Sequence, residues 1–221
     1  MTATASPVQP IVVFPVGHEE TILAAGLASS TLMLESMLDT VTAGDRGGED
    51  PWPLWLLHSF TKSVRRARRQ AERDAILELA DTMTCKQIVV GDATAFAFEP
   101  MPYEKYPRAI KRLQVSGLDI AARPDGMPAC EVPSTTGPTP TITLNASLGM
   151  TTGKSAAQAA HALGLWGLEV TRLELKAWLE DPGARLEFGS VTVPDPDRIV
   201  VRDSGLTEIA AGSHTAAITR F

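Results

Sequence analysis

Short apolar runs and longer apolar stretches alternate through the first hundred residues. The runs Ile11–Val16, Lys86–Val90 and Thr94–Phe98 have the length and composition of buried β-strands. Glu19–Leu38 is mostly apolar over a length typical of a helix, and Trp52–Ala80 predicts one or two further helices. This part of the chain is therefore expected to form a small α/β unit.

The same kinds of segment recur after residue 140. Thr141–Asn145 predicts a strand, Ser155–Leu165 predicts a helix, and Leu173–Leu179 predicts another helix. Two more strands are predicted at Arg185–Val193 and Arg198–Arg202. From both halves we expect an α/β protein with a mixed β-sheet flanked by helices.

The order strand, helix, helix, strand is predicted in both halves, which is typical of a duplicated unit. Ile88-Val-Val-Gly-Asp92 also parallels Ile199-Val-Val-Arg-Asp203. Gly17-His18-Glu19-Glu20 then stands where the second half has a Gly-Lys loop. The alternative is that short apolar repeats match by chance.

Composition divides the chain into three regions. Residues 1–115 are expected to form an N-terminal α/β region, and residues 138–221 a C-terminal domain. Residues 116–137 are rich in Pro, Gly, Ser and Thr, and predict an extended linker on the surface.

The N-terminal region contains a cluster of cations that we expect on a helix. With helical spacing, one face is cationic and the opposite face is apolar. The cations of that face are Lys62, Arg65, Arg66, Arg69 and Arg73. Such a stripe is typical of salt-dependent binding to RNA backbones, although a solvated helix face has the same pattern.

The loop before the C-terminal helix has the composition of an anion-binding site. Backbone N–H groups at a helix N-terminus, together with the ammonium group of Lys154, favour a phosphate. The expected phosphate-binding residues are Gly149, Thr151, Thr152, Gly153 and Ser155. A P-loop NTPase is a weaker alternative, because the two glycines are one residue too close for a P-loop.

Two motifs in the C-terminal region resemble the signatures of the type-2 peptidyl-tRNA hydrolases. The first is Leu148-Gly-Met-Thr-Thr-Gly-Lys-Ser-Ala-Ala-Gln-Ala-Ala-His-Ala162. The second, within Val201–Thr215, is Arg-Asp-Ser-Gly-Leu-Thr followed by Ala-Ala-Gly-Ser-His-Thr. Together they place the resemblance over residues 138–221.

The resemblance implies a site of Lys154, Asp203 and Thr207, supported by Gln158 and His161. Hydrolysis of the peptidyl-tRNA ester needs a positioned water, a proton acceptor and a stabilised oxyanion. Asp203 would orient and deprotonate the water, Lys154 would hold a phosphate or the oxyanion, and Thr207 would bind the water or ribose. The implied partner is peptidyl-tRNA or another N-blocked aminoacyl-tRNA.

Two of these residues also have structural interpretations. Asp203 precedes Ser204-Gly205, a combination that is common in turns. His161 lies among alanines, as expected for a helix that packs on a sheet.

Departures from the family pattern favour a different function, that of a non-catalytic tRNA- or RNA-binding relative. Glu208 stands where the family usually has an amide, and it would repel tRNA. Pro194-Asp-Pro-Asp197 alone separates two predicted strands, which is too short for a parallel crossover. Either those strands form a hairpin, or the missing layer comes from elsewhere in the chain.

Composition adds expectations about partners and location. The net charge of −6 means that RNA binding would depend on local cationic patches. The isolated cysteines and histidines predict no metal or other cofactor, and suit a reducing cytoplasm. The apolar stretch Ile22–Leu34 is expected to be too short to span a bilayer, so no membrane partner is expected. Because the family is commonly dimeric, a homodimer or an intramolecular pseudo-dimer is expected.

Overall fold

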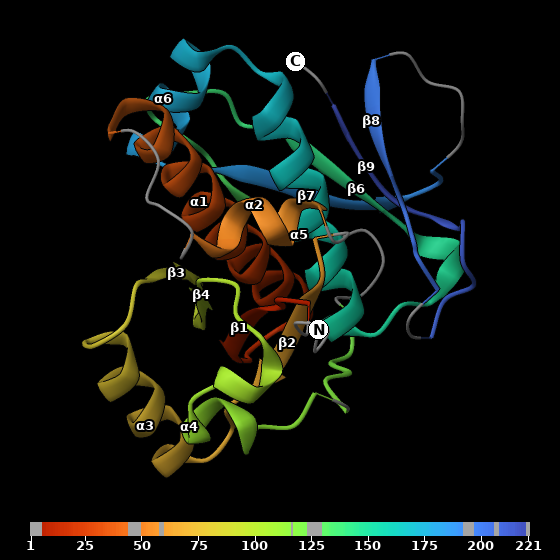
Figure 1. Ribbon diagram of the computed structural model, residues 1–221. Coiled ribbons are helices and arrows are strands. Elements are labelled where there is room, and N and C mark those ends of the chain that lie inside the picture. Colours follow the sequence, from red (N-terminus) through yellow and green to blue (C-terminus); the bar gives the residue numbers. More distant parts are fainter. Residues whose placement is uncertain are drawn as a thin grey trace.

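The chain folds into two mixed β-sheets flanked by helices (Figure 1). The computed structural model describes residues 6–43, 50–57, 60–115, 117–122, 130–191, 197–205 and 208–219. The predicted α/β class is confirmed.

The first sheet belongs to the N-terminal half. Its strands are β1 (Gln9–Phe14), β2 (Lys62–Arg66), β3 (Cys85–Val90) and β4 (Ala93–Phe98), in the order β2-β1-β4-β3. β1 pairs in parallel with β2 and antiparallel with β4, and β3 and β4 form an antiparallel hairpin.

Both faces of this sheet are covered. Ile11 and Val13 of β1 belong to a core that includes helix α1 (His18–Ala43). Val12 and Phe14 point to the opposite face, because successive strand residues alternate. There they pack in a second core with α3 (Gln70–Ala80) and α4 (Arg108–Lys111), which follows the 3-10 turn η1 (Tyr103–Lys105).

The second sheet belongs to the C-terminal half. Its strands are β5 (Cys130–Val132), β6 (Thr141–Asn145), β7 (Ala184–Gly189), β8 (Arg198–Arg202) and β9 (His214–Thr219), in the order β5-β7-β6-β9-β8. β6 is parallel to β7 and antiparallel to β9, and β8 and β9 form a hairpin.

The two halves have the same topology. β1-α1-α2-β2, with α2 at Pro51–Leu57, corresponds to β6-α5-α6-β7, with α5 at Thr152–Glu169 and α6 at Arg172–Glu180. In both halves a hairpin completes the sheet, and the strand order and pairing directions agree. A strand-helix-helix-strand repeat is therefore present in the fold, but its last strand in the first half is β2, which the sequence predicted as part of a helix.

Helices α1 and α5 pack against each other between the two sheets (Figure 1). Their contacts run in the same direction along both helices: His18 with Thr152, Gly26 with Ala159, and Leu34 with Gly167. The two helices are therefore parallel, and their N-termini lie together. Glycine permits this close approach, since a Cβ atom on Gly167 would lie 2.3 Å from Leu34 Cδ1.

The predicted basic helix is wrong. Its first part, Lys62–Arg66, is strand β2, which pairs with β1 from Gln9 opposite Lys62 to Val13 opposite Arg66. The helix α3 starts only at Gln70. Side chains of a strand alternate between two faces, so the five cations do not share one stripe.

The interpretation of residues 116–137 as a surface linker is wrong for parts of this segment. Leu118 is buried, and Cys130–Val132 forms the edge strand β5 against β7. The segment therefore contributes to the core and to the second sheet.

The connection from β7 to β8 is not a hairpin, which was the first of the two predicted alternatives. The strands do not form a hairpin, because β6 and β9 lie between them. They run parallel, since both are parallel to β6, so the chain crosses the sheet between Gly189 and Arg198. The matching connection in the first sheet contains α3.

Helix α1 qualifies as a membrane span by length and composition, over His18–Thr40. The expectation that the apolar stretch is too short is therefore wrong. Most of this window is buried inside the fold, and the core helix of a soluble protein meets the same criteria, so the helix is weak evidence for a membrane.

Candidate active site

Three polar side chains lie on one face of helix α5. Lys154, Gln158 and His161 are spaced by four and three residues, which puts them on one face of a helix. The helix begins after Thr151, whose hydroxyl accepts a hydrogen bond from the Lys154 N–H at 3.3 Å. This cap fixes the first turn, which carries Lys154.

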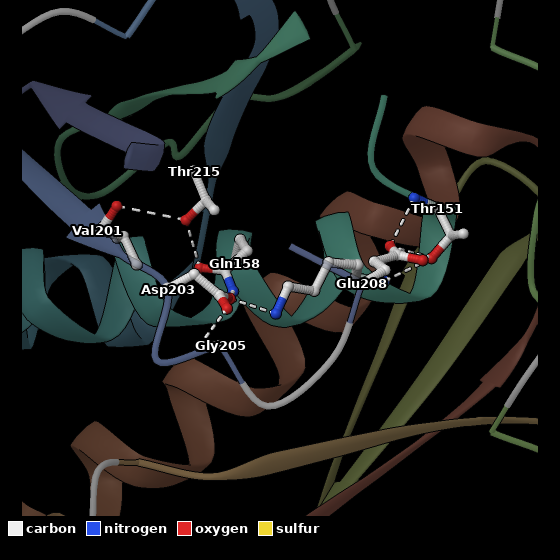
Figure 2. Close-up of polar contacts among 8 residues, drawn as sticks. Thr151, Gln158, Val201, Asp203, Gly205, Glu208 and Thr215 are labelled. Atoms are coloured by element: carbon white, nitrogen blue, oxygen red, sulfur yellow. Dashed lines mark hydrogen bonds and ion pairs between the residues drawn. The ribbon is translucent and has the colours of Figure 1, made fainter. Parts of the chain in front are cut away.

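Asp203 faces this surface of α5 from the end of β8. Its Oδ2 forms an ion pair with Lys154 Nζ and accepts a hydrogen bond from Gln158 Nε2 at 3.0 Å. Its Oδ1 accepts the N–H of Gly205 at 2.7 Å (Figure 2). The side chain of Asp203 is 2% exposed and that of Lys154 is 11% exposed. The pair is thus held in a fixed, largely water-excluded geometry.

Thr215 on β9 orients Gln158. The Thr215 hydroxyl donates to Gln158 Oε1 at 2.6 Å and also lies 3.3 Å from the Val201 carbonyl oxygen (Figure 2). Thr215, Gln158 and Asp203 thus form a series of hydrogen-bonded side chains, and all three are buried. Because Gln158 Oε1 is used by Thr215, its amide nitrogen must face the carboxylate.

Protein groups already occupy the N-terminal amides of α5. Glu208 Oε1 accepts hydrogen bonds from the Thr151 N–H at 3.0 Å and the Thr151 hydroxyl at 2.9 Å (Figure 2). The Gly153 N–H donates to the Leu118 carbonyl oxygen at 3.2 Å. The Glu208 carboxylate therefore lies at the helix N-terminus, where we expected a phosphate.

The other residues predicted to bind phosphate lie around this turn. The Thr152 hydroxyl accepts the Ile120 N–H at 2.9 Å and contacts His18 Nδ1 at 2.8 Å. Thr152 and Ser155 are buried. Gly149 has a φ of 53° and ends the short 3-10 helix η2 (Ala146–Leu148). These residues shape the start of α5 and its contact with the N-terminal half.

The Lys154–Asp203 pair lines a cleft of about 990 Å³ between the two halves of the chain. Helix α5, the end of β8 and Glu208 form one wall. The other wall comes from β2 and from Gln114, Val115, Gly117 and Leu118. Its lining includes Phe60, Lys62, Gln114, Leu118, Lys154, Gln158, His161, Arg202, Asp203 and Glu208.

Lys62 and His161 meet at the same cleft. Lys62 Nζ lies 3.3 Å from His161 Nδ1, and 4.6 Å from the centre of the Trp55 ring. Desolvation by burial sets the pKa of Lys62 well below its ordinary value. Burial, and the nearby charges of Lys62 and Lys154, likewise hold the pKa of His161 well below its ordinary value. His161 is therefore neutral at physiological pH.

The four arginines of the predicted stripe separate into different environments. Arg65 is buried beneath the first sheet and donates to the carbonyl oxygens of Ile110 and Leu113. Arg73 lies over the Phe14 ring, and Arg69 pairs with Glu72 at the start of α3. Arg66 alone of the four reaches the cleft rim, where it donates to the Gly117 carbonyl oxygen at 2.7 Å.

Several site residues were not singled out from the sequence. Thr215 and Gly205 both belong to the second quoted motif, in which Gly205 lies two residues after Asp203, so the sequence contained a signal for both. The sequence contained no signal for Phe60, Gln114, Val115, Gly117 and Leu118, because only tertiary packing brings them to α5. Thr207, predicted to be catalytic, lies outside the described residues.

The first half lacks the equivalent ion pair. Glu20 is the third residue of α1, as Lys154 is the third residue of α5. Asp92 follows β3 as Asp203 follows β8. Two carboxylates cannot form the pair that Lys154 and Asp203 form, so the site is present in one half. Among the described residues, no cluster of three or more His, Cys, Asp or Glu side chains could hold a metal ion.

No protein-family model, curated protein or solved structure matches this chain.

Proposed function

We propose that this protein hydrolyses the ester bond of peptidyl-tRNA, or of another N-blocked aminoacyl-tRNA, in the cytoplasm. The observation that carries the proposal is the ion pair between Lys154 and Asp203, held by Gln158 in the wall of a large cleft. The two motifs that resemble type-2 peptidyl-tRNA hydrolases supply both members of the pair.

Asp203 would act on the attacking water. Its Oδ1 accepts one described hydrogen bond, from Gly205, and a carboxylate oxygen can accept two. A water bound at this atom would be oriented toward the ester carbonyl carbon. As the water adds, its proton passes to the carboxylate, and the ribose oxygen leaves with a proton while the peptide acid is released.

Lys154 would stabilise the negative charge that forms on the carbonyl oxygen. Its ammonium group lines the cleft beside Asp203, in a site with little exposure to water. A positive charge acts more strongly there than in bulk water. The Gln158 amide would keep the carboxylate fixed during the reaction.

The cleft has the size and the charges for a nucleic-acid end. Its volume of about 990 Å³ is at the upper end of ordinary small-molecule sites. Arg202 and Arg66 lie at its wall and rim, and both can contact phosphates. Local cations of this kind would offset the net charge of −6.

A non-catalytic RNA-binding relative is the second candidate. The three partners that hold the Asp203 carboxylate favour it, because they leave that group less able to accept a proton. A P-loop NTPase has less support, because the Thr151, Gly153 and Lys154 amides already bond protein oxygens.

The test is hydrolysis of N-acetyl-aminoacyl-tRNA by the purified wild-type protein and by Asp203→Asn. We expect release of the N-acetyl-amino acid by the wild type and its loss in the variant. Binding of the same tRNA without any release by the wild type would favour the RNA-binding alternative.

A further inference from the structure

Lys62 is an unusual member of the cleft wall. It comes from the N-terminal half, its ammonium group faces α5, and its described contacts are with a carbonyl oxygen, aromatic rings and His161. Within the described part of the chain, no carboxylate lies at ion-pair distance from its Nζ. A buried cation without a counter-charge is costly.

Aromatic rings lie against one side of Lys62. Phe60 has a φ of 56°, a left-handed conformation that is costly for a bulky side chain. Its ring stacks on Trp55 at 4.9 Å and lies 6.1 Å from His161. This backbone conformation places the Phe60 ring beside the Lys62 side chain, where it excludes water from one side of the ammonium group.

The position of Lys62 relative to the proposed reaction centre follows from α5. Lys154 contacts Asp203 and His161 contacts Lys62, and these two helix residues are seven positions apart. Seven residues of an α-helix correspond to about 10 Å along its axis. The cleft therefore has an ion pair at one end and, at the other, a lysine with no ion-pair partner among the described residues.

The negative charges of the proposed substrate determine which of its groups can bind Lys62. The peptide carboxyl group is esterified, so every RNA-borne negative charge of that substrate is a phosphate. A phosphodiester in contact with Lys62 would supply the missing counter-charge. The neutral His161 imidazole can remain beside both groups as a hydrogen-bond partner.

We propose that Lys62 forms an anion subsite, which binds a phosphodiester of the substrate's RNA end about 10 Å from the reacting ester. This inference rests on the proposed function. It makes the N-terminal half a part of the substrate site.

The subsite has a consequence for protons. Burial favours the uncharged amine in the unliganded protein, and a bound phosphate favours the ammonium form. Phosphate binding should therefore be accompanied by proton uptake. The other titratable or charged groups of the cleft are His161 and Lys154 on α5, Arg202 and Asp203 at the end of β8, and Glu208. Neither β1 nor α2, which pack against Lys62, carries a titratable side chain.

The experiment is titration calorimetry with the trinucleotide CpCpA, the 3′ end of tRNA. It uses the wild type, Lys62→Met, and Lys86→Met as the matched control, since Lys86 pairs with Glu35 outside the cleft. We expect Lys62→Met to weaken binding about tenfold and to reduce the slope of log K against log salt by about 0.7, the value for one contact to a single strand. Lys86→Met should bind as the wild type does.

A wild-type measurement does not depend on how the variant folds. In two buffers of different ionisation enthalpy, the wild-type binding heat should reveal proton uptake, and Lys62→Met should lack it. The proposal is overturned if the wild type takes up no proton, if it does not bind CpCpA, or if Lys62→Met keeps the wild-type salt slope. Lys62-dependent binding of inorganic phosphate that is as tight as that of CpCpA would overturn the RNA assignment.

The binding assay involves no hydrolysis, so the two proposals fail separately. Lys62-dependent CpCpA binding without ester cleavage would refute the esterase and support the subsite. Ester cleavage with Lys62-independent binding would refute the subsite and support the esterase.

Discussion

Lys62 and Lys154 bring two ammonium groups from different halves of the chain to one cleft, and their surroundings differ. Lys154 forms an ion pair with Asp203, whereas Lys62 lies against Trp55, Phe60 and His161. The two halves have the same topology, yet they contribute different chemistry to a single site.

Removing the charge of Lys62 should stabilise the fold. Burial lowers its pKa in the folded state, so between the folded and unfolded pKa values the unfolded chain binds more protons. The free energy of unfolding of the wild type then falls as the pH decreases through that window. Lys62→Met lacks this loss, and it should be the more stable protein at pH 7, with a smaller difference at higher pH.

Urea denaturation of both proteins at several pH values between 7 and 10 measures this difference. Lys86→Met again serves as a control for loss of a lysine. A Lys62→Met protein that is less stable than the wild type by the same amount at every pH would contradict the claim that burial disfavours the charged form of Lys62.

Glu208 should weaken RNA binding through its position at the N-terminus of α5. Its carboxylate accepts two hydrogen bonds from Thr151, and it lies on the cleft wall. Glu208→Gln removes the negative charge and should tighten CpCpA binding several-fold at low salt, with less gain at high salt. Glu187→Gln, in which the changed residue pairs with Arg185, is the matched control. Equal affinities for the wild type and Glu208→Gln would refute this role.

The Thr215 hydroxyl should matter for stability through Gln158. Thr215→Val leaves Gln158 Oε1, a buried acceptor, without its 2.6 Å hydrogen bond. An unsatisfied buried polar group costs about 1–3 kcal/mol, and we expect a loss of this size in urea denaturation. Thr136→Val, at an exposed threonine that donates to the Ala177 carbonyl oxygen, should cost much less. Equal losses for both variants would show that the hydrogen bond from Thr215 to Gln158 contributes little to stability.

Much of the fold could be predicted because its apolar pattern is local. The strands β1, β3, β4 and β6 and the helices α1 and α5 lie where hydrophobic periodicity predicts them. The repeat was also visible, since Ile88-Val-Val and Ile199-Val-Val occupy matching strands β3 and β8.

The error at β2 has a physical cause. Arg and Lys favour helices, and the segment Lys62–Arg66 has a single β-branched residue, Val64. Parallel pairing with β1 overrides this local preference, and the partner lies about fifty residues earlier in the chain. The sequence therefore predicted that Lys62 is an RNA-binding cation, but it could not place the side chain in the cleft.

The candidate site was predictable in part for the same reason. Lys154, Gln158 and Asp203 belong to motifs, and the structure brings them together. The opposite wall comes from β2, which the sequence predicted as part of a helix, and from the chain around Gln114 and Leu118, where the linker-like composition begins. Its role depends on contacts with α5 that no local pattern encodes.

The central claim is that the carboxylate of Asp203 takes part in ester hydrolysis. Its most direct test is the rate of release of N-acetyl-amino acid from N-acetyl-aminoacyl-tRNA by Asp203→Asn, compared with the wild type. Asp92→Asn, the matching change in the first half, is the control. We predict a loss of about 10²–10⁴-fold for Asp203→Asn, as expected for a group that accepts a proton, and wild-type activity for Asp92→Asn. Equal rates for Asp203→Asn and the wild type would contradict the claim.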